Sequence, residues 1–168
     1  MIYLRRISES DLPILFQYRN DFNIYKWCRQ YGPLHSAGHK KWYELQVDDI
    51  YTEMFSICHN NEMLPIGVCG LTDVDLVNRH AEFSLYIGKK FQGHGCAKAA
   101  LKELFDFGFK SLNMHMIWGE TFDGNPAMHL FKKMGMEVSG KRPQFYYKEG
   151  KYIDAHLLYI TREKWLNT

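Results

Sequence analysis

The stretch KFQGHGCAKAALKELFDFGF, residues 90–109, decides the fold. Gly93, Gly95 and Ala97 stand at alternate positions directly before an amphipathic helical run, and the preceding residues 81–88, AEFSLYIG, have the composition of a strand. The apolar stripe of the helix consists of Ala97, Ala100, Leu101, Leu104, Phe105 and Gly108. The stretch therefore predicts a strand, a loop with little side chain and a helix that packs on a sheet.

The loop at residues 92–97 has the properties of an anion site. A helix N-terminus leaves its first amide N–H groups unpaired and carries the positive end of the helix dipole. Small residues let a phosphate approach those amides, and glycine permits the positive φ that turns N–H groups inward. Neither the Lys-Ser/Thr of a P-loop nor GxGxxG spacing is present. The alternative is a tight turn with a helix cap.

The rest of the chain predicts an alternation of strands and helices. We expect a strand at 2–7, a helix capped by Ser8 or Ser10, an irregular aromatic stretch at 21–35 and a helix from Ser36 to residue 47. Strands at 54–60, 65–76 and 81–88, with turns at 60–61 and 78–79, form an antiparallel meander. A strand at 115–122, a helix from Asn125 to 134 and strands at 142–150 and 151–161, joined near Glu149, complete the order.

Composition indicates one domain, residues 1–168, without a linker. The net charge of +2 comes from scattered Lys and Arg, which argues against nucleic acid as a partner. No run is long enough to cross a bilayer and the N-terminus has no apolar signal region, so we expect no membrane partner and a cytoplasmic location. The cysteines lack CxxC pairing, which suits free thiols and signals no zinc site; they are Cys28, Cys58, Cys69 and Cys96.

Two histidines, His35 and His39, have the i, i+4 spacing that can place two imidazoles on one helix face. No third ligand accompanies them, so we predict no metal. His39 is expected instead to contact a substrate or to cap its helix.

The loop and two neighbouring blocks resemble one enzyme superfamily. The pattern Gln92-x-x-Gly95-x-Ala97 resembles the pyrophosphate motif Q/R-x-x-G-x-G/A of the GNAT superfamily of acyl-CoA N-acyltransferases. Residues 81–91, AEFSLYIGKKF, resemble its central strand, and residues 124–140, GNPAMHLFKKMGMEVSG, its second conserved block. The resemblance implies an α/β (α+β) fold with a mixed, mostly antiparallel sheet, splayed central strands and flanking helices, and acetyl-CoA as co-substrate.

Two further segments resemble a particular branch. Residues 19–27, RNDFNIYKW, and 39–46, HKKWYELQ, look like the branch of ribosomal-protein N-terminal acetyltransferases and acetyltransferases of nucleotide-linked amino sugars. This implies acetyl transfer to a primary amine of a small molecule, and a nucleotide-linked amino sugar is the preferred acceptor. The amine would attack acetyl-CoA directly in a ternary complex. The alternatives are an N-terminal protein acetyltransferase, a non-catalytic CoA-binding module and a plain protein-interaction domain. A homodimer is also expected.

The resemblance assigns the donor site to specific positions. The pantetheine arm is expected along Leu85, Tyr86 and Ile87. Asn125 matches an asparagine that bonds the pantetheine or a nearby helix end; alternatively it caps the helix at Pro126. Direct transfer needs no nucleophile, so the cysteine of the loop is not expected to be catalytic. The pyrophosphate is expected on Gln92, Gly93, His94, Gly95, Cys96 and Ala97.

The expected base is Glu82, because some superfamily members use a glutamate at this strand position, directly or through water, to deprotonate the amine. Alternatively it faces solvent or pairs with Arg79 or His80. The superfamily's acid is a tyrosine whose position here is Phe131, which has no proton to give. Tyr146 is the substitute that we prefer. Tyr86 and Tyr147 are the other candidates, and unassisted departure of a thiolate with a pKa of about 8.5 is the remaining alternative.

The acceptor side is expected among the N-terminal rings and cations. The residues predicted to contact the acceptor are Arg19, Asn20, Trp27, His39 and Trp42. Rings can stack on a base or a sugar face, although core packing is the competing role. Arg19, Lys26 and Arg29 suit a diphosphate, and ordinary solvated charge is the alternative.

Overall fold

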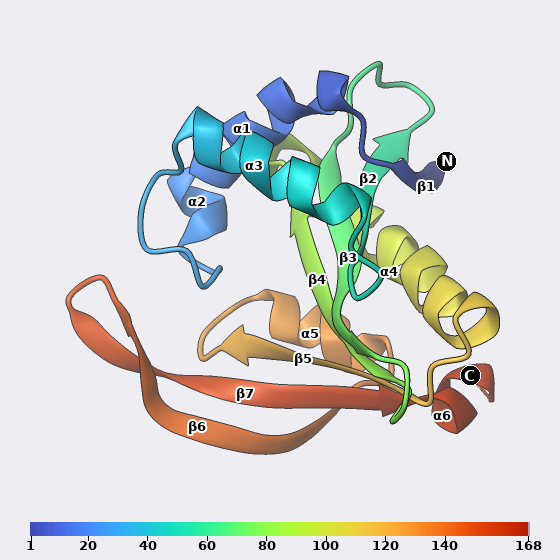
Figure 1. Cartoon of the computed structure of the whole chain (residues 1–168). Coiled ribbons are helices and arrows are strands. Elements are labelled where there is room, and N and C mark those ends of the chain that lie inside the picture. The colour runs from blue at the N-terminus through green and yellow to red at the C-terminus, as the bar shows by residue number, and fades with distance from the viewer. Residues whose placement is uncertain (168) are drawn as a thin grey trace.

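Seven strands form one sheet in the computed structural model, which describes residues 1–167 (Figure 1). The sheet order is β1-β2-β3-β4-β5-β7-β6. Three helices precede β2, α4 links β4 to β5, α5 links β5 to β6, and α6 ends the described chain. The strands are β1 (Ile2–Arg6), β2 (Glu53–His59), β3 (Gly67–Asp75), β4 (His80–Ile87), β5 (Met116–Phe122), β6 (Glu137–Lys148) and β7 (Lys151–Thr161). The helices are α1 (Leu12–Asn20), α2 (Phe22–Tyr25), α3 (Ser36–Val47), α4 (Cys96–Asp106), α5 (Ala127–Lys133) and α6 (Arg162–Leu166).

The centre of the sheet is its one parallel junction. All other neighbouring strands are antiparallel, but β4 and β5 run parallel and are in register only at His80, Ala81 and Glu82, opposite residues 116–118. Beyond Glu82 the two strands diverge, as Figure 1 shows. The splayed, mostly antiparallel sheet that the resemblance implied is confirmed.

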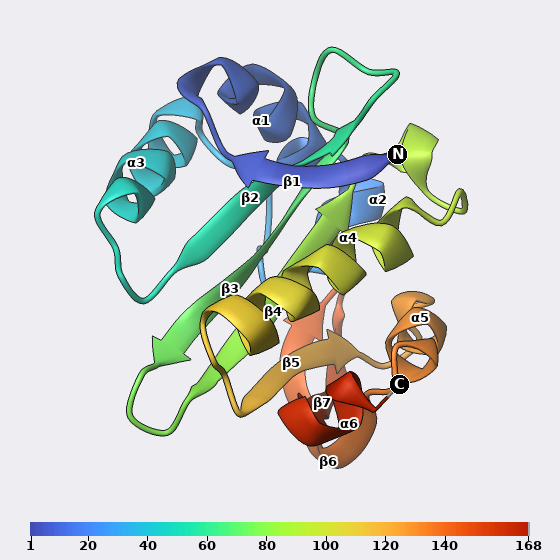
Figure 2. The ribbon, with the colours of Figure 1, turned by 90° about the vertical axis from the view of Figure 1, so that its right-hand side faces the viewer.

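Helices cover both faces of the sheet, with α1–α3 on one and α4 on the other (Figure 2). The apolar stripe of α4 packs into the main core, where the Phe105 ring meets Phe83 of β4 edge-on at 5.8 Å between centroids. Successive strand residues point to opposite faces, so Tyr86 packs instead with Leu15 of α1. By the same alternation, Glu82 lies on the α1–α3 face.

The observed elements follow the predicted order, with local differences. The aromatic stretch contains the unpredicted helix α2, whose N-cap Asp21 accepts a hydrogen bond from the Asn23 N–H at 2.9 Å. Ser36 is the first residue of α3, and His35 occupies the N-cap position. The helix from residue 96 changes to a π-helical turn at Phe107–Ser111, β6 begins five residues before the predicted 142, and α6 was not predicted.

Replacing Gly38 by Ala in α3 is expected to stabilise the protein by about 0.4–1 kcal/mol, because alanine loses less backbone entropy on folding. No atom lies within 4 Å of a Cβ built at this position. Urea denaturation measures the change. The matched control is Gly150→Ala, which is equally uncrowded but has a φ of +83° and should destabilise. A loss of stability in both variants would contradict the prediction.

Candidate active site

The glycine loop lies at the end of β4 and opens α4. Gly93 and Gly95 have φ of 80° and 78°, and Gly95 is the N-cap of α4. A Cβ at either position would meet nothing within 4 Å, so backbone conformation and not crowding selects glycine there. Gln92 Nε2 donates to the Ile87 carbonyl at 2.9 Å, which ties the loop to the strand. The loop leaves room for a ligand at the helix N-terminus.

The other predicted donor residues surround this loop. Leu85, Tyr86 and Ile87 lie beyond the last register pair with β5, so the β5-facing edge of this part of β4 is without a strand partner in the described chain. His94 is exposed and Cys96 is buried. The side-chain Oδ1 of Asn125 accepts from the Ala127 N–H at 3.0 Å, which supports the helix-capping alternative without excluding a ligand contact.

Glu82 is buried at the point where β4 and β5 part, with 6% of its surface exposed. The alternatives weighed for Glu82, exposure to solvent or an ion pair with Arg79 or His80, are not what the structure shows. Arg29 holds it instead, from the segment between α2 and α3: its Nη1 donates to Glu82 Oε2 at 3.0 Å and its Nη2 to Oε1. The two-pronged contact neutralises the buried carboxylate.

A second buried carboxylate extends this contact. Glu120 lies two residues beyond Trp118, the register partner of Glu82, and therefore on the same face. Arg29 Nε lies 3.4 Å from Glu120 Oε1, and Arg142 Nη1 donates to Oε2 at 2.8 Å. The Glu120 side chain is 2% exposed, whereas those of Arg29 and Arg142 are 50% and 40% exposed. We call Arg29, Glu82, Glu120 and Arg142 the carboxylate cluster.

Tyr146 of β6 adjoins this cluster. Its pKa is raised, first by burial and then by its hydrogen bond to the Glu120 carboxylate, while Arg29 opposes the shift. The structure thus brings both predicted catalytic residues, Glu82 and Tyr146, to Arg29, while Glu120 interacts with Tyr146 and Arg29.

The other hydroxyl candidates lie elsewhere. Tyr147 is half exposed and packs on Tyr152. The Tyr86 hydroxyl is buried and finds no hydrogen-bond partner within residues 1–167. Phe131 is buried against the ring of Phe83, at 5.0 Å between centroids. Of the candidates, Tyr146 alone contacts the carboxylate cluster.

Lys148 holds the segment that carries Arg29. Its Nζ donates to the Cys28 carbonyl at 2.5 Å and to the Gln30 carbonyl, the residues on either side of Arg29. Burial lowers the pKa of Lys148. In Figure 1 the tip of the β6–β7 hairpin lies at the left, on the same side of the molecule as this segment, and Lys148 is at the end of β6 that leads into the tip. We expect these two bonds to restrict the positions that Arg29 can adopt.

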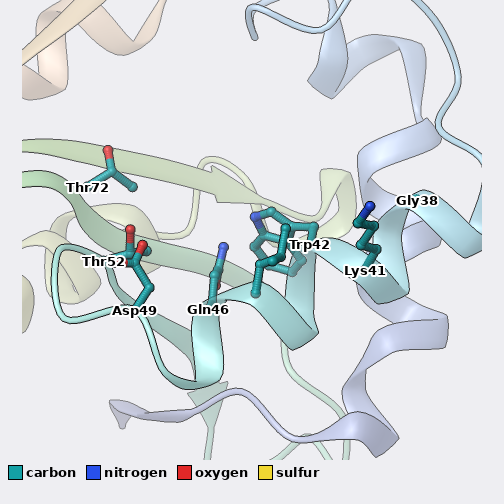
Figure 3. Close-up of a pocket in the computed structure, with 8 residues that line it drawn as sticks. Gly38, Lys41, Trp42, Gln46, Asp49, Thr52 and Thr72 are labelled. Atoms are coloured by element: carbon teal, nitrogen blue, oxygen red, sulfur yellow. The ribbon is translucent and has the colours of Figure 1, made fainter.

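Two open cavities lie on the same face as the cluster. Thr72, Glu82 and Trp118 are register partners on β3, β4 and β5, so their side chains form a row. Thr72 borders one cavity and Trp118 the other, with Glu82 between them. The first, about 460 Å³, lies beside α3 and is lined by Gly38, Lys41, Trp42, Leu45, Gln46, Asp49, Thr52 and Thr72 (Figure 3). The second, about 590 Å³, is lined by Met116, Trp118, Val138, Ser139, Arg142, Leu157, Leu158 and Tyr159.

The predicted acceptor residues occupy different surroundings. Trp42 lines the first cavity, and Trp27 packs on the cluster of Phe122, Tyr146 and Ala155. Arg19 lies over the Tyr86 ring, 5.5 Å from its centroid.

The remaining two acceptor candidates are tied into the fold. The Asn20 amide donates to the Leu34 carbonyl and accepts from the Leu34 N–H. His39 is buried inside α3 and stacks on Trp42 at 5.1 Å, so it does not cap the helix. Their acceptor contacts remain predictions.

Glu120, Arg142 and Lys148 were not predicted from the sequence. Glu120 had a usable signal, because a strand through Trp118 places residue 120 on the same face as its cross-strand neighbours. No such sequence signal exists for Arg142 and Lys148 of β6, because their partners lie on distant segments of the chain.

The described residues show neither a metal-binding group nor a membrane span. Among residues 1–167, no three His, Cys, Asp or Glu side chains gather as metal ligands. No helix in the same range has both the length and the apolar character needed to cross a membrane.

Comparisons with known proteins agree with this geometry. The chain is 28% identical to the spermidine N(1)-acetyltransferase of Vibrio cholerae over 167 residues, covering 98% of this chain and 95% of the relative. It is 25% identical to that of Escherichia coli K12, covering 98% and 88%. The crystal structure of the Vibrio cholerae spermidine N-acetyltransferase in complex with CoA and spermine superposes with a TM-score of 0.94 at 26% identity, covering 99% and 98%.

The family comparison settles the class of the protein. The model of the acetyltransferase (GNAT) domain matches residues 2–137, most of the chain. The family's acyl donor is acetyl-CoA. The protein therefore belongs to the GNAT family and is an N-acetyltransferase.

Proposed function

We propose that this protein acetylates a primary amine of a small molecule by direct attack in a ternary complex with acetyl-CoA. The observation that carries the proposal is the buried Glu82 carboxylate at the point where β4 and β5 part. A carboxylate at this point can accept the proton of an amine placed between the diverging strands. Tyr146, beside the cluster, is the proposed acid.

The donor side fits acetyl-CoA. Gly93 and Gly95 leave the N-terminus of α4 open to a phosphate, and the unpaired β4 edge offers backbone groups to an extended pantetheine arm. When bound, acetyl-CoA supplies an acetyl group activated as a thioester. Residues 92–97, Leu85, Tyr86 and Ile87 are the proposed contacts.

The acceptor preferred from the sequence is a nucleotide-linked amino sugar. Trp42 in the first cavity and Trp118 in the second offer rings for a base or a sugar face. A polyamine is the second candidate, because the two curated relatives described above are named spermidine acetyltransferases. The N-terminal amine of a protein is the remaining alternative.

Gly95→Asp is expected to weaken acetyl-CoA binding by about tenfold or more, because it adds a negative charge beside the proposed pyrophosphate site. Isothermal titration of both proteins with acetyl-CoA measures the change. Gly95→Asn is the matched control, since Asn and Asp both tolerate a φ near the observed 78° and differ in charge. Equal affinities of the Asp and Asn variants would contradict a phosphate at this loop.

An acetylation assay separates the classes of function. The protein is incubated with acetyl-CoA and an amino sugar, a polyamine or a peptide with a free N-terminus, and the release of the CoA thiol is followed. Acetyl-CoA binding without transfer to any amine would favour the non-catalytic module. Transfer to the peptide alone would favour the protein acetyltransferase.

A further inference from the structure

The charge around Glu82 bears on which amine the site accepts. In the carboxylate cluster, the negative charges of Glu82 and Glu120 are balanced by the positive charges of two arginines. Lys148, two residues after Tyr146 on β6, adds a third positive charge. The segment 21–39 that covers the cluster contains Asp21, Lys26 and Arg29 as its formal charges. Asp21 is occupied as the N-cap of α2. The surroundings of Glu82 therefore carry an excess of positive charge.

Arg29 occupies the place where an acceptor ammonium would meet Glu82. Its guanidinium uses both terminal nitrogens on this carboxylate and its Nε on Glu120. An ammonium that takes over Glu82 must displace Arg29 from at least one oxygen. The displaced guanidinium is half exposed and keeps Glu120 through Nε, but its two terminal nitrogens lose their charge-assisted hydrogen bonds, which an acceptor oxyanion would restore.

We propose that the acceptor carries an oxyanion, a carboxylate or a phosphate, beside its amine, and that Arg29 selects it. This inference rests on the proposed function. Binding exchanges ion pairs: the acceptor ammonium pairs with Glu82, and the acceptor oxyanion pairs with Arg29. Both charges of the acceptor and both charges of the protein stay compensated. A polyamine can satisfy Glu82 but supplies no anion for the terminal nitrogens of Arg29, which then keeps only Glu120.

Arg142 extends the oxyanion site into the second cavity. Its Nη1 is engaged by Glu120, its guanidinium lies over the Phe145 ring at 4.9 Å, and its side chain is 40% exposed. The same side chain lines the cavity beside Trp118 and Tyr159. An oxyanion held between Arg29 and Arg142 would place the body of the acceptor against these two rings.

The charge of the cavity walls agrees with this selection. Among the residues that line the two cavities, Asp49 alone is acidic, and it already accepts from the Tyr51 N–H at 2.9 Å. Lys41 and Arg142 are the basic ones. The second and third ammonium groups of a polyamine would find little to pair with there.

The test compares acceptors that differ only in the oxyanion. Glucosamine 6-phosphate is paired with glucosamine, and L-methionine with L-methionine amide; spermidine is the polycation. We expect kcat/KM to be at least about tenfold higher for the charged member of one pair, the gain from one added ion pair. The pair that responds tells phosphate from carboxylate. Higher kcat/KM for spermidine than for both oxyanion acceptors would overturn the proposal while leaving the proposed acetyltransferase activity intact.

Variants tie the preference to Arg29. Arg29→Met should remove the difference within the responding pair and raise kcat/KM for spermidine, because Glu82 and Glu120 lose a competing cation. Arg29→Lys should retain part of the preference, since it keeps the charge but not the two-pronged geometry. Lys141→Met is the matched control: it removes a neighbouring β6 cation that pairs with Asp154, outside the cluster. An unchanged preference in Arg29→Met overturns the proposal.

A binding measurement keeps the test independent of turnover. Each acceptor is titrated into the CoA-loaded protein, and the charged member of a pair should bind at least about tenfold tighter to wild type but not to Arg29→Met. Equal binding of both members in both pairs refutes the oxyanion site. Loss of CoA binding itself, in contrast, would refute the proposed function.

Discussion

Glu82→Gln is expected to lower kcat for acetyl transfer by about 100-fold or more, with little change in acetyl-CoA affinity. Gln has nearly the same shape but cannot accept the proton of the attacking amine, and general base catalysis contributes about 10²–10⁴ in rate. The glycine loop of the donor site lies at the far end of β4 from Glu82, so the affinity for the donor should persist. Steady-state kinetics and isothermal titration measure the two quantities.

Glu120→Gln is the matched control for this variant. Glu120 is as buried as Glu82 and also contacts Arg29, but it lies beyond the register pairs on β5. If kcat falls equally in both variants, the loss comes from the broken ion pairs with Arg29 and not from removal of the proton acceptor. An unchanged kcat in Glu82→Gln would remove Glu82 from the mechanism.

Gly119→Ala is expected to destabilise the protein by about 3 kcal/mol, the upper range for overpacking a core. A Cβ on residue 119 would lie 2.3 Å from Cε1 of Phe83. That ring is held edge-on by Phe105 and Phe131, at centroid distances of 5.8 and 5.0 Å, and has little room to turn. Urea denaturation gives the change in the free energy of unfolding.

Gly140→Ala in β6 is the comparison, because the nearest atom to its Cβ is Leu157 Cδ1 at 3.9 Å. We expect it to change stability by less than about 0.5 kcal/mol. The double variant Gly119→Ala/Phe83→Leu should recover part of the loss by removing the ring edge. If Gly119→Ala lowers the free energy of unfolding by no more than Gly140→Ala does, the Phe83 ring can move aside without strain and the prediction is wrong.

The sequence predicted elements where a local physical signal was strong. The α4 stripe and the bare loop before it determine one helix, its packed face and its open N-terminus. The turns at Asn78–Arg79 and Glu149–Gly150 were recognisable because Asn and Gly are common turn residues. The structure shows positive φ at Arg79, Glu149 and Gly150. Splaying of β4 and β5 came from the resemblance alone, since no residue pattern within either strand encodes where a neighbour departs.

The carboxylate cluster could not be predicted in the same way. Arg29 lies in a segment without strand or helix periodicity and 53 residues from Glu82, so nothing local links the two. Lys148 is 120 residues from the Cys28 carbonyl that it bonds. Such contacts depend on the tertiary path of the chain. The missed helix α2 was different, because Asp21 before Phe22 is an ordinary N-cap signal that the surrounding rings obscured.

The short junction between β4 and β5 also divides the molecule mechanically. On one side are β1–β4, on the other β5–β7, and each set is continuous along the chain apart from its helices. Within the described residues, β4 and β5 share three register pairs, and the Arg79 carbonyl accepts from the His115 N–H next to them. A donor bound between β4 and β5 would contact both sets of strands. It would raise the free energy needed to separate them, since a ligand that binds only the folded state stabilises that state. The junction at which the reactants are proposed to meet is therefore also the place where a bound donor would add most to the pairing of the two sets of strands.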